Sequence, residues 1–267
     1  MRVARLLFRA LTCLGPEIRT VRRRGIRWRL DLSDGIDLSI YLTGTFGLGV
    51  LRTIRKIVDD DCVLIDVGSN RGAVTIPLAT RMCRGRIIAL DPVREHCDRL
   101  MNDLSLNQNI SCEVVVEQAF VAQSPETKLP DVIGAKWNLV DFDTSGNALC
   151  ASPCPTDGAV TTSVDDVVAR HGISRLSLIK IDVDGYELDV INGALKTLRD
   201  LGPPIVMEWS PTAMGIHGVS PADLAEVLEC AGYQPSLIRW ASARRISWEE
   251  LLISKSRRTS RDLLLTK

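Results

Sequence analysis

The chain has 267 residues, 45% of them hydrophobic and 25% charged, and its formal net charge is zero. This composition suits one large globular domain and excludes a disordered chain, and the charge gives no general attraction to nucleic acid. No run approaches the roughly 20 apolar residues of a transmembrane helix, so we expect a cytoplasmic protein.

Residues 1–58 are expected to form an extension packed on the main domain. Apolar residues recur at helical spacing before residue 15, and residues 26–32 alternate like a half-buried strand. Residues 37–58 return to helical spacing. Nine arginines precede Asp31, against one acid, Glu17. The first helix either docks on the protein or makes a weak contact with a membrane surface; a solvated basic face is the third alternative.

Residues 59–267 alternate strand and helix patterns, which is typical of a parallel sheet with crossover helices. We expect a Rossmann-like, doubly wound α/β sheet of seven strands, in the order 3-2-1-4-5 with two closing strands, the last one antiparallel and inside the edge. The stretch 123–161 is rich in turn-forming residues, and we interpret it as an inserted hairpin or lid. The strands are predicted at 62–67, 86–90, 112–116, 176–183, 204–209, 233–240 and 261–266, and the helices at 73–82, 94–106, 163–171, 187–199 and 221–231.

The eight cysteines are scattered, apart from Cys150 and Cys154. That pair lacks the second ligand pair of a zinc site. The spacing therefore favours small buried side chains in a reducing compartment over a metal or disulfide framework.

A glycine-bearing loop follows the first strand of this domain. It runs from Asp66 through Gly68, Ser69 and Asn70 to Gly72 and leads into a helix. Glycines allow a ligand to approach the main chain, and the free N–H groups of a helix start can bind a carboxylate. Tight turns without ligands also contain glycine, so the loop by itself is a weak signal.

Asp91 strengthens this signal, because it ends the next strand about 20 residues later, where a carboxylate can accept both hydroxyls of a ribose. A dinucleotide loop needs glycine where this chain has Asn70, and Asp66 would face a pyrophosphate. The negative charge of Asp66 suits a methionine ammonium instead. The pattern favours S-adenosylmethionine over NAD(P).

A second motif runs from Lys180 through Asp182 and Asp184 to Glu187, at the end of the strand 176–183. This end of a strand lies at the edge where doubly wound sheets bind ligands. Glu208 ends the next strand in the same way. Asp184 and Glu187 have a simpler explanation, because acids favour the start of the following helix.

From about residue 25 onward, the chain resembles the FkbM family of S-adenosylmethionine-dependent methyltransferases. The resemblance rests on five segments taken together: Asp66-Val67-Gly68-Ser69-Asn70-Arg71-Gly72, Asp91-Pro92, Asn107, the motif from Ile179 to Glu187 with Asn192-Gly193-Ala194, and Pro204-Ile205-Val206-Met207-Glu208.

The resemblance implies a class I methyltransferase that O-methylates a hydroxyl of a sugar, glycan, lipid or secondary metabolite. It assigns the methionine end of the donor to Asp66, Gly68, Ser69, Asn70 and Gly72, the ribose to Asp91, and the border of the adenine to Gln118 and Ala119. Three residues depart from the family's usual pattern: Asp91 and Asp184 stand where it has glutamate, and Arg71 replaces a commonly apolar residue.

Methyl transfer to a hydroxyl needs alignment and removal of a proton. We expect Asp182 to act on the acceptor, with Glu208 and Lys180 assisting; a divalent cation held by Asp182 and Glu208 is the alternative. His96, His171 and His217 are other candidate bases, and only His217 is expected near the site. The rival functions are an NAD(P)-dependent oxidoreductase and a non-enzymatic scaffold with the same fold.

Overall fold

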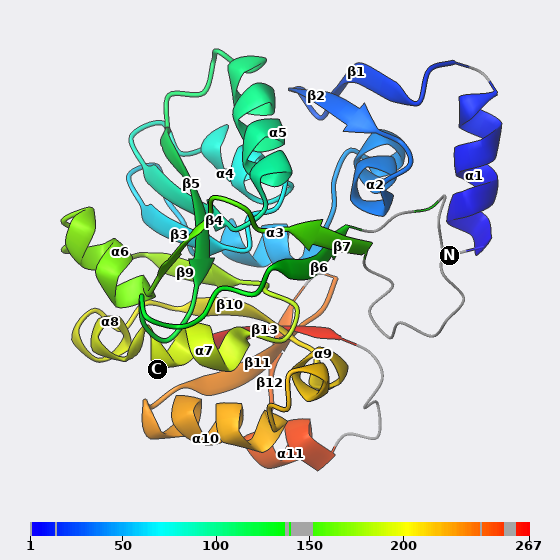
Figure 1. Ribbon diagram of the computed structural model, residues 1–267. Coiled ribbons are helices and arrows are strands. Elements are labelled where there is room, and N and C mark those ends of the chain that lie inside the picture. Colours follow the sequence, from blue (N-terminus) through cyan, green and yellow to red (C-terminus); the bar gives the residue numbers. More distant parts are fainter. Residues whose placement is uncertain (1, 14, 137–138, 140–151, 241, 254–259) are drawn as a thin grey trace.

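A nine-stranded, mostly parallel sheet forms the centre of the protein (Figure 1). The computed structural model describes the whole chain except residues 1, 14, 137–138, 140–151, 241 and 254–259. In spatial order the strands are β12 (Ala243–Arg245), β11 (Gln234–Ile238), β13 (Arg261–Thr266), β10 (Ile205–Trp209), β9 (Leu178–Ile181), β3 (Val63–Val67), β4 (Arg86–Asp91), β5 (Glu113–Val121) and β8 (Val160–Thr162).

The strand order confirms the expected topology. The parallel strands β5, β4, β3, β9 and β10 reproduce the order 3-2-1-4-5, and β13 lies antiparallel between β10 and β11. The expected number of seven was too low, because the short strands β8 and β12 extend the two edges. Each has only three residues, too few to give a readable alternating pattern.

Side-chain alternation along the strands divides the core into two layers. Ile65 and Ile179 face the layer that includes helices α6, α7, α8, α10 and α11. Leu64 and Leu178 face the opposite layer, with α3 and α4. The helices are α3 (Leu48–Ile54), α4 (Thr75–Ala79), α5 (Arg94–Ser105), α6 (Val164–Arg170), α7 (Glu187–Asn192), α8 (Leu195–Asp200), α9 (Pro211–Ile216), α10 (Pro221–Cys230) and α11 (Trp248–Ile253).

Two helices predicted as continuous are interrupted at glycines. The stretch 37–58 contains α2 (Gly35–Thr43) and α3, separated by Gly44 and Gly47 in the left-handed region. The stretch 187–199 divides at Gly193 into α7 and α8. A Cβ on Gly193 would lie 2.1 Å from the carbonyl oxygen of Ala122. Position 193 therefore requires glycine, because the backbone of a distant segment packs against it at the break between the two helices.

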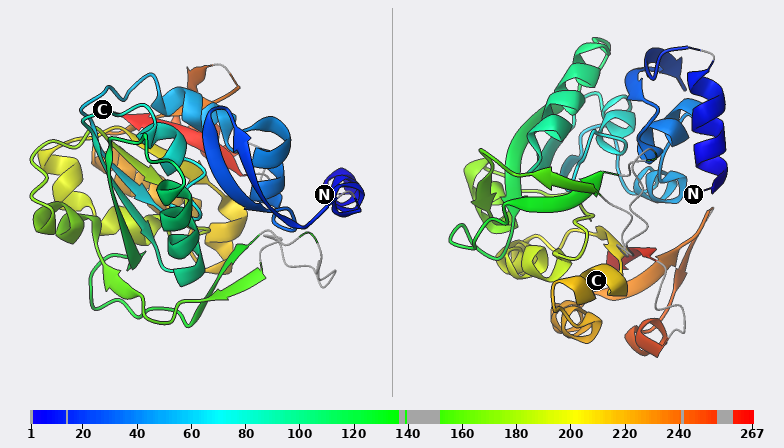
Figure 2. Two further views of the ribbon diagram at one scale, coloured as in Figure 1. Left: turned by 90° about the horizontal axis from the view of Figure 1, so that it is seen from above. Right: turned by 45° about the vertical axis from the view of Figure 1, so that its right-hand side comes forward.

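The N-terminal extension contributes no strand to the main sheet. Helix α1 (Arg2–Thr12) lies on the outer side of the extension (Figure 2). The strand β1 (Ile18–Arg23) pairs with β2 (Ile26–Asp31) in a separate hairpin. The strand β1 was not predicted. Trp28 and Leu30 pack with α2, α4 and α5 in a shared apolar cluster. Among the described helices, none has the length and hydropathy needed to cross a bilayer.

The insertion contains the expected hairpin, formed by β6 (Val132–Lys136) and β7 (Ser152–Pro155). Cys62, Cys97, Cys112 and Cys154 are buried, as expected for small apolar side chains, whereas Cys13, Cys83 and Cys230 are exposed. Cys150 lies outside the described residues.

Candidate active site

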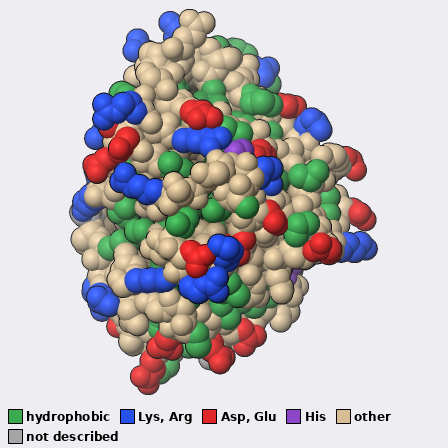
Figure 3. Space-filling view, turned by 90° about the vertical axis from the view of Figure 1, so that its left-hand side faces the viewer, with side chains coloured by type: hydrophobic (Ala, Val, Ile, Leu, Met, Phe, Trp, Pro, Cys, Tyr) green, Lys and Arg blue, Asp and Glu red, His purple; other side chains and the backbone are tan. Residues whose placement is uncertain are grey.

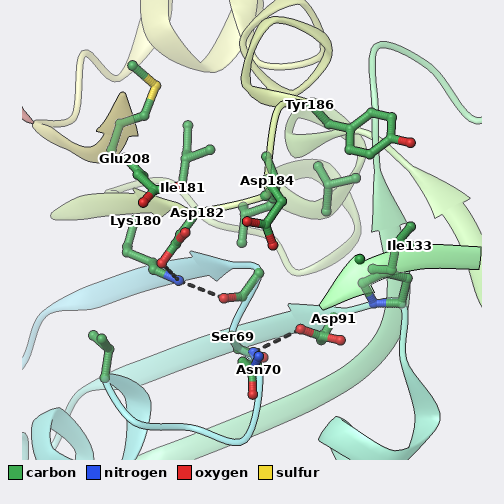
Figure 4. A pocket seen from close by; sticks show the side chains of 18 of the residues that line it. Ser69, Asn70, Asp91, Ile133, Lys180, Ile181, Asp182, Asp184, Tyr186 and Glu208 are labelled. Carbon is green, nitrogen blue, oxygen red and sulfur yellow. Dashed lines mark hydrogen bonds and ion pairs between the residues drawn. The ribbon is translucent and has the colours of Figure 1, made fainter. Parts of the chain in front are cut away.

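A cavity of about 530 Å³ lies at the carboxyl ends of β3, β4, β9 and β10. Its volume is within the usual range for small-molecule sites. Apolar walls come from Phe46 and Val50 of the N-terminal extension. Ile133 of the β6–β7 hairpin and Tyr186 complete them (Figure 4). The extension and the insertion thus both contribute to the cavity.

The loop after β3 is held against two neighbouring strands. The N–H groups of Gly68 and Ser69 donate to the carbonyl oxygen of Leu90 at 2.9 and 3.0 Å. Gly68 has φ +71°, and a Cβ there would lie 1.8 Å from the carbonyl oxygen of Asp182. Only glycine permits both this conformation and this approach. Gly68 therefore brings the glycine loop and the acidic motif together.

Asp91 fixes the loop from the end of β4. Its Oδ2 accepts the Asn70 N–H at 2.8 Å, while Oδ1 accepts the Val93 N–H at 2.9 Å and lies 3.0 Å from His96 Nδ1. The carboxylate is 4% exposed and lines the cavity with Ser69 and Asn70 (Figure 4). Oδ1 is thus occupied by two partners, whereas Oδ2 keeps a further lone pair for a ligand hydroxyl.

Three of the predicted donor residues lie behind the cavity wall. Asp66 is fully buried; its Oδ2 accepts from Thr75 Oγ1 at 2.6 Å, and its Oδ1 lies 3.1 Å from Lys180 Nζ. Gly72 turns the chain with φ +86° beside Leu100. The Gln118 amide donates to the carbonyl oxygens of Pro92 and Asp157, whereas Ala119 lines the cavity.

The strand register places three carboxyl groups side by side. Ile181 of β9 pairs with Met207 of the parallel strand β10. Asp182 and Glu208 directly follow these two residues, so they lie next to each other at the ends of the strands. Glu208 stands directly opposite Asp262 of β13. Directly opposite residues project to the same face of a sheet. All three line the cavity.

Lys180 connects these acids to the donor loop. Its Nζ donates to the Gly68 carbonyl oxygen at 2.6 Å and lies 3.6 Å from Asp182 Oδ2 (Figure 4). Burial alone would lower the pKa of this ammonium, but the charges of Asp66 and Asp182 hold the pKa above its ordinary value. Lys180 therefore stays charged and ties β9 to the loop after β3.

The acids of the site titrate near neutral pH. Burial and the charge of Asp182 raise the pKa of Glu208 to about 8, that of Asp184 to about 7 and that of Asp262 to about 6. Burial also raises the pKa of Glu187 to about 7. The Asp182 side chain is 47% exposed, and its charge acts on all four. Protonated and ionised carboxyl groups thus lie next to each other in one cavity.

Sequence reasoning missed Asp262 and Tyr186 as cavity residues. The expected antiparallel placement of the last strand was the available signal for Asp262, because that pairing brings an acid opposite Glu208. The Tyr186 ring stacks on His217, with centroids 4.1 Å apart, and His217 lines the cavity as expected. The other histidines have different partners: His96 contacts Asp91, and His171 contacts Glu117.

The described residues give no support to the metal alternative. Within them, no group of three or more His, Cys, Asp or Glu side chains is arranged to hold a metal ion. S-adenosylmethionine fits the site better. The buried hydroxyl of Ser69, a cavity residue, has no hydrogen-bond partner among the described atoms. Such a group costs free energy unless a ligand binds it.

Comparisons with known proteins identify the family. The family model described as "Methyltransferase FkbM domain" matches residues 66–235. Hexuronic acid methyltransferase AglP of Haloferax volcanii is 25% identical over 186 residues, 67% of this chain and 66% of that protein. Methyltransferase sdnD of Sordaria araneosa is 23% identical over 175 residues, 57% of this chain and 68% of that protein. The chain thus spans about two thirds of these relatives.

Among solved structures, the methyltransferase FkbM from Methylobacillus flagellatus aligns with a TM-score of 0.48 and 16% identity, over 85% of this chain and 52% of that one. The family match covers well over half of the chain and begins at Asp66, the start of the glycine loop. The chain belongs to the FkbM family of S-adenosylmethionine-dependent methyltransferases.

Proposed function

We propose that this chain transfers a methyl group from S-adenosylmethionine to a hydroxyl group of a sugar, glycan, lipid or secondary metabolite. One observation supports this above all: Lys180 contacts both the Gly68 carbonyl oxygen and the half-exposed carboxylate of Asp182. The loop for the donor and the acid for the acceptor are therefore positioned by the same buried side chain.

The donor side consists of the cavity residues of the glycine loop and its neighbours. Ser69 and Asn70 offer polar groups, and Asp91 offers the remaining lone pair of Oδ2 to a ribose hydroxyl. Ala119 borders the adenine, with Gln118 holding the adjoining backbone. Gly72 and Asp66 act indirectly, Gly72 by turning the loop and Asp66 by neutralising Lys180. When bound, S-adenosylmethionine supplies an electrophilic methyl carbon on a sulfonium.

On the acceptor side, Asp182 accepts the proton of the hydroxyl. Asp182 suits this step because it is half-exposed to the cavity, whereas burial and the charge of Asp182 raise the pKa values of Glu208 and Asp262. Glu208 keeps its proton at neutral pH and donates a hydrogen bond to an acceptor oxygen. A carboxylate that accepts a proton beside a carboxylic acid that donates a hydrogen bond suits a polyhydroxylated molecule. In such a molecule one hydroxyl loses its proton to the base, and a neighbouring oxygen accepts the hydrogen bond.

A sugar-like acceptor is also favoured by the relative from Haloferax volcanii, whose name states that it methylates a hexuronic acid. The apolar walls around Phe46 and Ile133 suit a less polar acceptor, such as a secondary metabolite. The acceptor is best identified by incubating the protein with a labelled methyl donor and host extracts. Absence of any labelled product would favour a non-enzymatic scaffold.

Donor binding is testable on its own by calorimetry with S-adenosylmethionine, S-adenosylhomocysteine and NAD. We expect both sulfur compounds to bind and NAD not to bind. Asp91→Ala removes a charge-assisted contact to the ribose and should weaken binding by about 2 kcal/mol. Asp157→Ala, beside the Gln118 amide but outside the cavity wall, is the control. Binding of NAD alone would support the oxidoreductase instead.

A further inference from the structure

The outward face of the β1–β2 hairpin carries four exposed arginines and one partly exposed acid, Asp31, which stands opposite Ile18 at the end of the strand pair. Arg27 and Arg29 alternate outward from β2, while Trp28 between them is buried. Arg22 on β1 is exposed and stands directly opposite Arg27. Arg24, at the turn, is also exposed. Like charges directly opposite each other destabilise a strand pair, so this arrangement costs stability in the free protein.

The inward arginines of the same hairpin differ from these four. The guanidinium groups of Arg19 and Arg23 lie over the Tyr41 ring, 5.4 and 4.6 Å from its centroid. They also donate to oxygens of Tyr41. The outward arginines make no ion pair with any acid of the described chain. Their charges are therefore available to an external anion.

Exposed apolar side chains also occur on the N-terminal extension that carries this basic face. Ile18 shares the outward face of β1 and is 48% exposed, and on α1 Leu6 is 67% and Leu7 39% exposed. Figure 3 shows that on the opposite side of the molecule acidic and basic side chains are interspersed. The surplus of arginine over acid is thus a property of the first 30 residues, although the net charge of the chain is zero.

We propose that the hairpin face formed by Ile18, Arg22, Arg24, Arg27 and Arg29, together with Leu6 and Leu7 of α1, binds the surface of an anionic lipid bilayer. Arginines attract acidic headgroups, and partly exposed aliphatic side chains insert at the boundary with the acyl chains. A nucleic acid would use the arginines but leave the aliphatic side chains in water. A second copy of this face would be repelled by its own charge.

The test is co-sedimentation of the full chain with vesicles of phosphatidylcholine, with and without phosphatidylglycerol. We expect binding only to the anionic vesicles, decreasing as salt is added. The double variant R22Q/R27Q should lose about 30-fold in partition coefficient, since each arginine near such a surface contributes about 1 kcal/mol. L6Q/L7Q should weaken binding without changing its salt dependence.

The control is R84Q/R175Q, which removes two positive charges from highly exposed side chains elsewhere. It should bind vesicles within about twofold of the unmodified chain. R22Q/R27Q should melt at the same temperature or higher, because it relieves the opposition of two like charges. Equal binding of R22Q/R27Q and the unmodified chain, or tighter binding to a single-stranded RNA than to vesicles at equal phosphate, would overturn the proposal.

Discussion

Two groups of ionisable side chains lie near the glycine loop, and they differ in charge balance. Arg71 is buried and pairs with Asp37 and Asp103, while Arg99 also pairs with Asp37. Arg99 has a further, exposed partner in Glu95, and the buried pairs join the extension to the loop and α5. At the carboxyl edge of the sheet, Asp182, Glu208 and Asp262 line the cavity, and among the described residues Lys180 pairs with Asp182 and Asp66.

The difference shows that burial of charge does not by itself mark a functional site. The Arg71 network is more deeply buried, but its charges compensate each other and it lies behind the cavity wall. The edge cluster has excess acid, a cavity in front of it and carboxyl groups with raised pKa values. Uncompensated titratable groups around a cavity are typical of sites that act on a ligand.

The largest expected effect comes from the edge cluster. Asp182→Asn keeps the shape of the side chain and removes the charge that accepts the acceptor's proton. We expect methyl transfer to fall ~10²–10⁴-fold while the affinity for S-adenosylmethionine changes little. Donor calorimetry and turnover with the identified acceptor measure the two quantities. Asp223→Asn, on the surface of α10, is the control, and near-normal turnover in Asp182→Asn would refute the assignment.

The Arg71 network should instead respond in stability. Arg71→Met leaves Asp103 buried without its cation, and breaking a buried ion pair on one side costs about 3 kcal/mol or more. Chemical denaturation measures the loss. The double variant R71M/D103N removes the orphaned charge as well and should recover part of the stability. If R71M/D103N is no more stable than R71M, the loss comes from packing against Trp28 rather than from charge.

A third effect is a pH dependence of stability. The pKa of Glu208 is raised from 4.5 to about 8 by burial and by Asp182. Between these values the unfolded chain has released this proton and the folded chain retains it, so stability falls as pH rises toward 8. Glu208→Gln cannot ionise and should gain about 4 kcal/mol relative to the unmodified chain between pH 5 and pH 8.5, since each unit of pKa shift is worth about 1.4 kcal/mol.

Thermal melting of both proteins at the two pH values measures this difference. Glu249→Gln removes an exposed carboxyl group of α11 and should show no such change with pH. If the melting temperature of Glu208→Gln differs from that of the unmodified chain by the same amount at pH 5 and at pH 8.5, the carboxyl group of Glu208 keeps an ordinary pKa in the folded protein.

Sequence patterns alone predicted the sheet order, the glycine loop, Asp91 and the acids that end β9 and β10. These features follow from local rules: apolar strands alternate with helices, and polar residues at the ends of parallel strands meet at one edge of the sheet. The positions of Asp182 and Glu208 were therefore predictable, although they are 26 residues apart in the chain.

Only the tertiary structure decided which of these residues reach the cavity. Asp66 was expected to contact the donor, but it lies behind the wall because Lys180, from a strand more than a hundred residues away, occupies its carboxylate. Asp262 joined the site because β13 inserts antiparallel beside β10 and brings it opposite Glu208. Both outcomes depend on pairings between distant segments, and a pattern read along one strand carries no information about the side chain that will stand opposite it.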